Sequence, residues 1–233
     1  SLVGYCVATP QGEVGSKGLL YDYLLGANGV FVRSETPLLS ATVRCFGPAY
    51  MNDAVRGLAD VSPSVELPRG KAPRGFLHMM ADWCRFGPSM EHAFAITYEG
   101  GEYHLQSPEQ EGREASVTFT KLPNTVVELH SHRDMGAFFS QQDTRDESGF
   151  GLFGVLSLVQ GQPVWRFRAG VFRYFMEGPM GDVFDVAVPD VADGPARLDG
   201  PANPMVSVVM ETQDGTRLRW RMPHPVAQSD AMM

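Results

Sequence analysis

The stretch Thr125-Val126-Val127-Glu128-Leu129-His130-Ser131-His132 decides how this sequence folds. Its β-branched and apolar residues predict a buried strand over residues 125–130. Side chains two positions apart in a strand point to the same face, so His130 and His132 project together, about 7 Å apart along the chain. Two imidazoles placed in this way can converge on one metal ion.

A second motif, Ser140-Gln141-Gln142-Asp143, follows after a gap of seven residues. It predicts a helix start, with the Ser140 hydroxyl at the N-cap and Asp143 in the first turn. A catalytic zinc takes three imidazole or carboxylate ligands and keeps a fourth position open. Each motif alone has an ordinary explanation, as a strand or as a helix cap. Together they predict Zn²⁺ bound by His130, His132 and Asp143.

In this order and spacing, the residues resemble the motif of the JAB/MPN (JAMM) zinc metalloproteases. That motif is an upstream glutamate, then H-[ST]-H, seven residues, S, two residues and D. The resemblance covers residues 72–173. Residues 137–140 and 146–150 also resemble bacterial members encoded beside ubiquitin-like conjugation genes, among them the protein A group of the PRTRC system. The resemblance implies an α/β fold with a JAB/MPN-like (cytidine-deaminase-like) mixed β-sheet flanked by helices.

The function that the resemblance implies is zinc-dependent hydrolysis of a peptide or isopeptide bond. The expected substrate is the C-terminal tail of a ubiquitin-like protein or its conjugate. The resemblance also implies that the Ser140 hydroxyl steadies the oxyanion of the tetrahedral intermediate. An inactive binding module or scaffold on the same fold is the alternative, since fold does not fix function.

The general base of such a hydrolase is a carboxylate that does not bind the metal. Residues 74–86 predict an amphipathic helix and residues 90–98 a strand, and family members place this glutamate between two such elements. Glu91 is therefore the best candidate. Glu128 shares the face of His130 and His132 and is expected either beside the site or in an ordinary charge pair. The other upstream carboxylates are expected to be solvated in a polar hairpin, namely Glu99, Glu102, Glu109, Glu111 and Glu114.

The remaining candidate side chains are expected to be structural. Ser131 points to the face opposite its two histidine neighbours. We expect His78, His92, His104 and His224 to be surface or helix-face histidines. Other hydrolytic or deaminating sites are not supported, because the sequence has no His-Glu-x-x-His and no Cys-x-x-Cys.

Composition limits the partners and the compartment. The chain has 233 residues and a formal net charge of −8, so we expect neither nucleic acid nor membrane as a partner. Three cysteines cannot all pair, which favours a reducing cytoplasm. No signal peptide or apolar run of about 18 residues is visible, and we therefore expect a cytoplasmic protein.

Three parts are expected along the chain. Residues 1–70 form a β-rich extension, with strands at 30–33 and 40–46, a turn at Asn28-Gly29 and a linker or extended wrap over 62–73. Residues 71–188 form the core, where 151–158 and 164–171 are strands; Arg166 and Arg168 fit a two-sided strand there. Residues 189–233 begin as a loop and end in a hairpin of 206–210 and 217–221. We expect the flanks to dock on a larger sheet, with at least one bordering the cleft.

Overall fold

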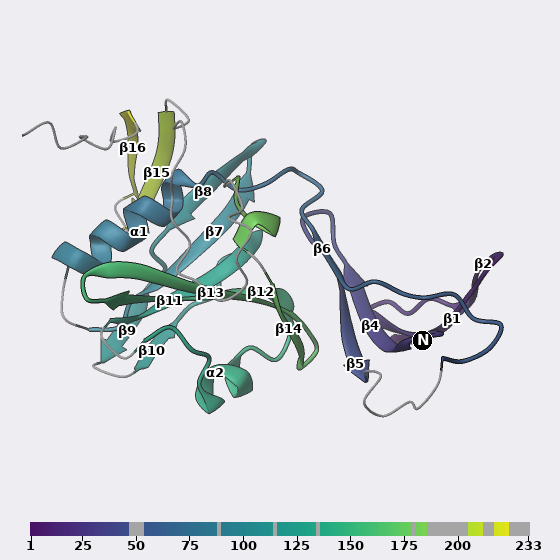
Figure 1. The fold of residues 1–233 in the computed structure, drawn as a ribbon. Helices are drawn as coiled ribbons and strands as arrows, with labels where there is room; N and C mark the ends of the chain where they lie inside the picture. Colours follow the sequence, from purple (N-terminus) through teal and green to yellow (C-terminus); the bar gives the residue numbers. More distant parts are fainter. Residues whose placement is uncertain are drawn as a thin grey trace, which may run out of the picture. The chain divides into compact units, whose positions relative to one another are not determined.

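The computed structural model describes residues 1–46, 54–87, 90–113, 116–133, 136–178, 180–185, 205–211 and 217–223. These residues form a mixed α/β structure that consists mostly of strands (Figure 1). The chain divides into two compact units. One consists of Ser1–Gly70, Phe138–Gly154 and Arg166–Val183, and the other of Lys71–Ala137, Val155–Trp165 and Phe184–Met233. The expected division at residues 70/71 and 188/189 stays a prediction about independently folding parts.

The first residues of the chain form a six-stranded sheet in the order β2-β1-β3-β4-β5-β6. Its strands are β1 (Val3–Thr9), β2 (Gly12–Ser16), β3 (Tyr21–Gly26), β4 (Gly29–Glu35), β5 (Ser40–Phe46) and β6 (Ser64–Glu66). β1 and β3 run parallel, and the other neighbours are antiparallel. Alternate side chains face a small core of Cys6, Ala8, Leu24 and Phe31, which Ala59 and Val61 cover.

The structure confirms the strands expected at 30–33 and 40–46 and the turn before Gly29. Residues 62–73 were expected as a linker or an extended wrap, and within them Ser64–Glu66 are extended and pair with β5 as strand β6. A short extended segment can add to a sheet edge even where nearby prolines argue against a regular strand.

An eight-stranded sheet has the order β14-β13-β12-β11-β7-β8-β15-β16. Its strands are β7 (Ala93–Glu99), β8 (Glu102–Gln106), β11 (Thr125–Arg133), β12 (Phe150–Val159), β13 (Gln162–Val171), β14 (Tyr174–Gly178), β15 (Met205–Glu211) and β16 (Arg217–Pro223). The strands β9 (Gln110–Arg113) and β10 (Ser116–Phe119) pair with each other. The predicted C-terminal hairpin is confirmed as β15 and β16, and β15 joins β8 in parallel at Val208↔Leu105.

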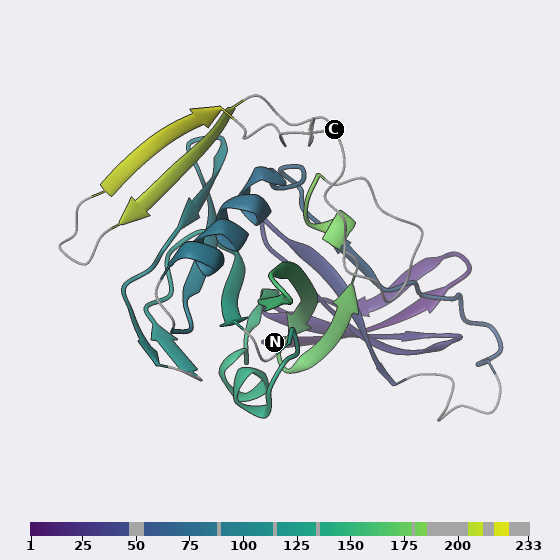
Figure 2. The same ribbon diagram turned by 60° about the vertical axis from the view of Figure 1, so that its left-hand side comes forward.

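The helix α1 (Gly75–Phe86) confirms the amphipathic helix expected over 74–86. Phe76, Leu77, Met80 and Cys84 are buried on one face, as their spacing requires. The helix ends at Gly87, whose N–H donates to the Trp83 carbonyl. Figures 1 and 2 both show α1 lying across the β7–β8 part of the sheet.

Other expectations concern thiols, membranes and the tail. Cys6, Cys45 and Cys84 are free thiols. Over the part of the chain that is described, no helix is both long and apolar enough to cross a bilayer. The loop expected over 189–204 and the tail from 225 lie outside the described residues.

Candidate metal centre

The strand β11 brings the two motif histidines together. Their Nε2 atoms lie 2.9 Å apart, and their ring centroids are 4.8 Å apart. His130 is half-buried and His132 is buried. The predicted convergence of these side chains is confirmed, because both project from the same face of one strand.

Asp143 lies in the first turn of α2 (Gln141–Asp146), which begins at the N-cap Ser140. The Ser140 N–H donates to Asp143 Oδ2 at 2.6 Å, and the Asp143 N–H donates to Ser140 Oγ at 3.1 Å. This reciprocal pair is a capping box and confirms the predicted helix start. It also fixes the orientation of the Asp143 carboxylate.

His130, His132 and Asp143 form a group that could hold a metal ion. One ligand atom from each residue lies within 4.8 Å of the other two. Two nitrogens bound to one tetrahedral zinc are about 3.3 Å apart, given Zn–N distances of 2.0–2.1 Å. The two Nε2 atoms are already near that separation. Two imidazoles and one carboxylate are a donor set that suits zinc.

Glu91 lies two residues before Ala93, the first residue of β7. The register pairs His130 with Ala93. Backbone and side-chain bonds then join Ser131 to His92, so the next step places Glu91 opposite His132. Residues opposite each other in an antiparallel pair share a face, with Cβ atoms about 5 Å apart. Glu91 is 4% exposed, which is unusual for a carboxylate.

The other upstream carboxylates have ordinary surroundings. Glu128 Oε1 lies 3.0 Å from Lys121 Nζ, which is the charge pair that was one of its two expected roles. The remaining described candidates are exposed, namely Glu99, Glu102, Glu109 and Glu111, while the Glu114 backbone and side chain lie outside the described residues. Glu91 is therefore the buried member of the candidate set that the structure describes.

Ser131 has the structural role expected of it. Its N–H donates to the His92 carbonyl at 2.9 Å, and its Oγ accepts the His92 N–H at 3.0 Å. These two bonds lock the register that places Glu91 opposite His132. Ser131 is itself 1% exposed, on the face of β11 opposite the ligands.

Two of the remaining histidines differ from the expectation of surface positions. His104 is buried in β8, with Nε2 3.1 Å from the Glu99 carbonyl oxygen. His92 is half-buried, with Nε2 2.8 Å from Ser107 Oγ, and burial lowers its pKa to about 4. Consecutive residues are buried in both β7 and β8, so an alternating pattern does not predict which histidines are covered. His78 lies half-buried on α1, as expected, and His224 is outside the described residues.

Sequence reasoning missed Arg168. The sequence grouped it with Arg166 in a two-sided strand, but it is 6% exposed whereas the Arg166 side chain is 49% exposed. Arg168 Nε donates to Glu147 Oε2 at 2.7 Å. The sequence does place an acidic residue, Glu147, shortly after Asp143. Nothing in the sequence identifies Arg168 as the partner of that residue.

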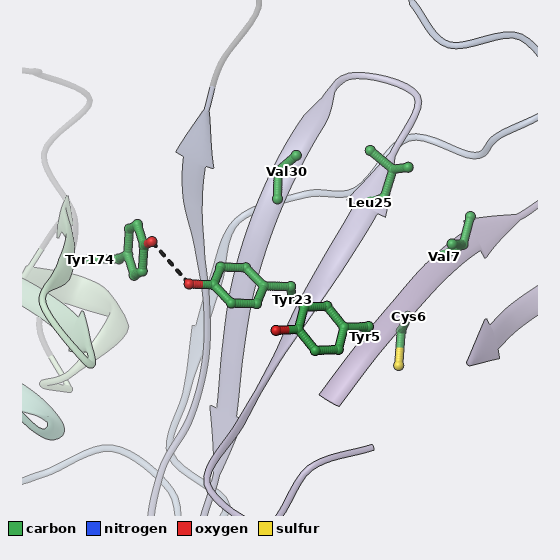
Figure 3. Close-up of a pocket in the computed structure, with 7 residues that line it drawn as sticks. All are labelled: Tyr5, Cys6, Val7, Tyr23, Leu25, Val30 and Tyr174. Carbon is green, nitrogen blue, oxygen red and sulfur yellow. Dashed lines mark hydrogen bonds between the residues drawn. The ribbon is translucent and has the colours of Figure 1, made fainter. Parts of the chain in front are cut away.

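A hollow on the six-stranded sheet is unrelated to this chemistry. It is lined by Tyr5, Cys6, Val7, Tyr23, Leu25, Val30 and Tyr174 (Figure 3). The Tyr23 and Tyr174 hydroxyls lie 3.1 Å apart, and this bond, followed by burial, raises the pKa of Tyr23. The seven lining residues include neither a carboxylate nor an imidazole, so they do not form a hydrolytic site.

A scan against protein-family models and a search of curated proteins returned no match to this chain. The residues of the site and the motif that they resemble are therefore the basis for its function.

Proposed function

We propose that this protein is a zinc-dependent hydrolase of peptide or isopeptide bonds, of the JAB/MPN type. The observations that carry the proposal are the 2.9 Å between the Nε2 atoms of His130 and His132 and the burial of Glu91, two residues before the register partner of His130. Asp143 supplies a third ligand atom within 4.8 Å. A zinc hydrolase of this type uses both a metal and a carboxylate that is not a ligand, and these residues could supply both.

Each residue has a distinct role in the proposed reaction. A zinc ion held by His130, His132 and Asp143 would acidify a water molecule and polarise the scissile carbonyl. Glu91 accepts the proton from the attacking water and delivers it to the leaving amine.

Ser140 serves the oxyanion in this proposal. Its Oγ accepts a hydrogen bond from the Asp143 N–H, and a hydroxyl that accepts one bond keeps its own hydrogen to donate. A donor aimed at the developing oxyanion lowers the barrier of acyl transfer. In this proposal Ser140 has two roles. It caps α2, the helix that carries Asp143, and its hydroxyl faces the reacting carbonyl.

The proposed substrate class is the C-terminal tail of a ubiquitin-like protein or of its conjugate. The support for this class is the resemblance to the JAMM motif and to bacterial members encoded beside ubiquitin-like conjugation genes. The net charge of −8 gives no reason to expect a polyanionic substrate.

Substitution of the proposed base tests this function. The probe is ubiquitin or a bacterial ubiquitin-like protein with a fluorogenic amide on its C-terminus. We expect the zinc-loaded parent to cleave it, and Glu91→Gln to keep zinc while losing about 10²- to 10⁴-fold in rate. Glu128→Gln is the matched control, because Glu128 lies on the same face of β11 but pairs with Lys121.

Two outcomes would reject the proposal. If Glu91→Gln cleaves as fast as the parent, or if Glu128→Gln is the variant that fails, Glu91 is not the base. If the parent holds zinc but cleaves no member of the probe set, the fold serves as a binding module.

A further inference from the structure

Arg168 occupies an unusual position for a charged side chain. It is buried in β13, where Nε and Nη2 lie 2.7 and 2.6 Å from Glu147 Oε2. Its guanidinium carbon also lies 3.9 Å from the ring centroid of Phe139 and 4.0 Å from that of Phe175. A planar guanidinium suits this combination of a carboxylate partner and aromatic stacking, whereas an ammonium does not.

The partners of Arg168 belong to the segment that carries Asp143. Glu147 is the C-cap of α2, and its N–H donates to the Asp143 carbonyl at 2.8 Å. Arg168 Nη1 also donates to Thr144 Oγ1 at 3.3 Å, one residue beyond Asp143. Phe139 immediately precedes the N-cap Ser140. Arg168 therefore contacts residues on both sides of the Asp143 turn.

The helix α2 needs such support from outside. It has six residues, all of them exposed or half-buried. Isolated helices of fewer than about 12 residues are marginal in water, and most helices in proteins depend on a packed apolar face. Since α2 has no buried face, its position depends on its capping box and on the residues that Arg168 holds.

We propose that Arg168 is a positioning residue that presets Asp143 for metal binding. The arginine does not touch the metal; it acts through Glu147, Thr144 and the turn that they close. This inference deepens the proposed function and rests on it for the identity of the metal. Residues that orient metal ligands from outside the coordination sphere commonly change metal affinity by 10- to 100-fold.

The experiment measures zinc affinity of the whole chain by competition with a chromophoric chelator. Arg168→Lys keeps the charge but loses the fork and the ring contacts. We expect about 10- to 100-fold weaker zinc binding and a changed visible spectrum of the Co²⁺-loaded protein. Arg166→Lys is the matched control, two residues away on the same strand, because Arg166 makes only an exposed pair with Glu177 at 3.6 Å. We expect this control to match the parent in both measurements.

A second variant tests whether weaker zinc binding comes from a displaced Asp143 or from a chain that does not fold. Arg168→Gln combined with Glu147→Gln removes both charges, so no buried charge is left unpaired. We expect it to fold and to bind zinc more weakly than the parent, as Arg168→Lys does. Parent-like affinity and an unchanged Co²⁺ spectrum in both variants would overturn the inference. Failure of both variants to fold would also overturn it, because the pair would then be a general requirement of the fold.

The role of Arg168 and the proposed hydrolysis can fail independently of each other in these experiments. If the parent binds zinc and hydrolyses nothing, the proposed function fails while the affinities still test Arg168. If the parent binds neither Zn²⁺ nor Co²⁺, both proposals are rejected.

Discussion

The strand that carries His130 and His132 and the helix that carries Asp143 hold their ligands in different ways. β11 has nine residues, pairs with β7 from Thr125 to His130 and bonds to His92 through Ser131, so backbone bonds set the position of the segment that carries both imidazoles. α2 has six residues without a buried face, so side chains set its position. Ser140 holds its beginning, and Arg168 binds the residues at its end.

Because β11 and α2 are held in different ways, substitutions around them should have different effects. Damage to the β11–β7 pair removes buried hydrogen bonds, and we expect it to reduce the free energy of unfolding more than the metal affinity. Damage around α2 leaves the sheets intact and is expected mainly to weaken metal binding. Removal of a ligand side chain, whether from β11 or from α2, should abolish metal binding.

The largest expected effect is the loss of the metal from His130→Ala. The parent should hold about one zinc per chain after reconstitution and dialysis, and the variant close to none, because a three-ligand site loses a third of its donors. His130 is half-buried, so the fold should survive. Elemental analysis provides the measurement, and His78→Gln on α1 is the control. Equal zinc in parent and His130→Ala would refute the assignment of the ligands.

Acid should weaken the β11–β7 region through His92. Burial lowers the pKa of His92 from the usual 6.5 to about 4, so between these values the unfolded chain takes up a proton that the native chain does not. Stability should therefore fall as pH decreases from about 6.5 to about 4, by at most about 3 kcal/mol from this residue. Urea unfolding of metal-free protein, compared with His92→Gln, isolates the contribution. A pH dependence that is identical in the two proteins would contradict it.

Ser131→Ala tests the register lock without touching a ligand. It removes the acceptor of the buried His92 N–H, and we expect a loss of about 1–3 kcal/mol in the free energy of unfolding. Zinc affinity should change less than in the Arg168 variants. Urea titration compares it with Ser148→Ala, an exposed serine after α2 that should be neutral. If Ser131→Ala loses zinc affinity but keeps the free energy of unfolding of the parent, the proposed difference between β11 and α2 is wrong.

Ser140→Ala is the counterpart on the helix and should cost less stability. Loss of an N-cap hydroxyl typically costs about 1 kcal/mol. Zinc affinity should fall as well, since the capping box orients the Asp143 carboxylate. Both quantities can be measured on the same preparation as Ser131→Ala. The comparison fails if Ser140→Ala keeps the zinc affinity of the parent.

The sequence predicted those parts of the site that depend on local spacing. The parity of a strand brought His130 and His132 to one face, and a capping pattern identified Ser140 and Asp143. The helix α1 followed from its apolar periodicity. Each of these features is determined within about ten residues of chain, which is the range over which pattern reasoning works.

Features that depend on distant residues could not be predicted in the same way. The place of Glu91 beside His132 needs the register of β7 against β11, and the burial of Arg168 needs β13 to meet residues 139–147. The strands β1 to β3 were not anticipated, because β2 contains two glycines and a glutamate and β3 places Asp22 between two tyrosines. Asp22 is buried in β3, where it pairs with Arg33 on β4 and accepts the Gly18 N–H.

Anomalous diffraction at the zinc absorption edge, from crystals grown with zinc, tests the central claim most directly. The account predicts one peak within about 2.2 Å of both Nε2 atoms of His130 and His132 and of a carboxylate oxygen of Asp143. The Glu91 carboxylate should lie beside the peak but outside bonding distance. A crystal soaked in zinc that shows no peak at this position, or one in which Glu91 replaces Asp143 as a ligand, would contradict the account.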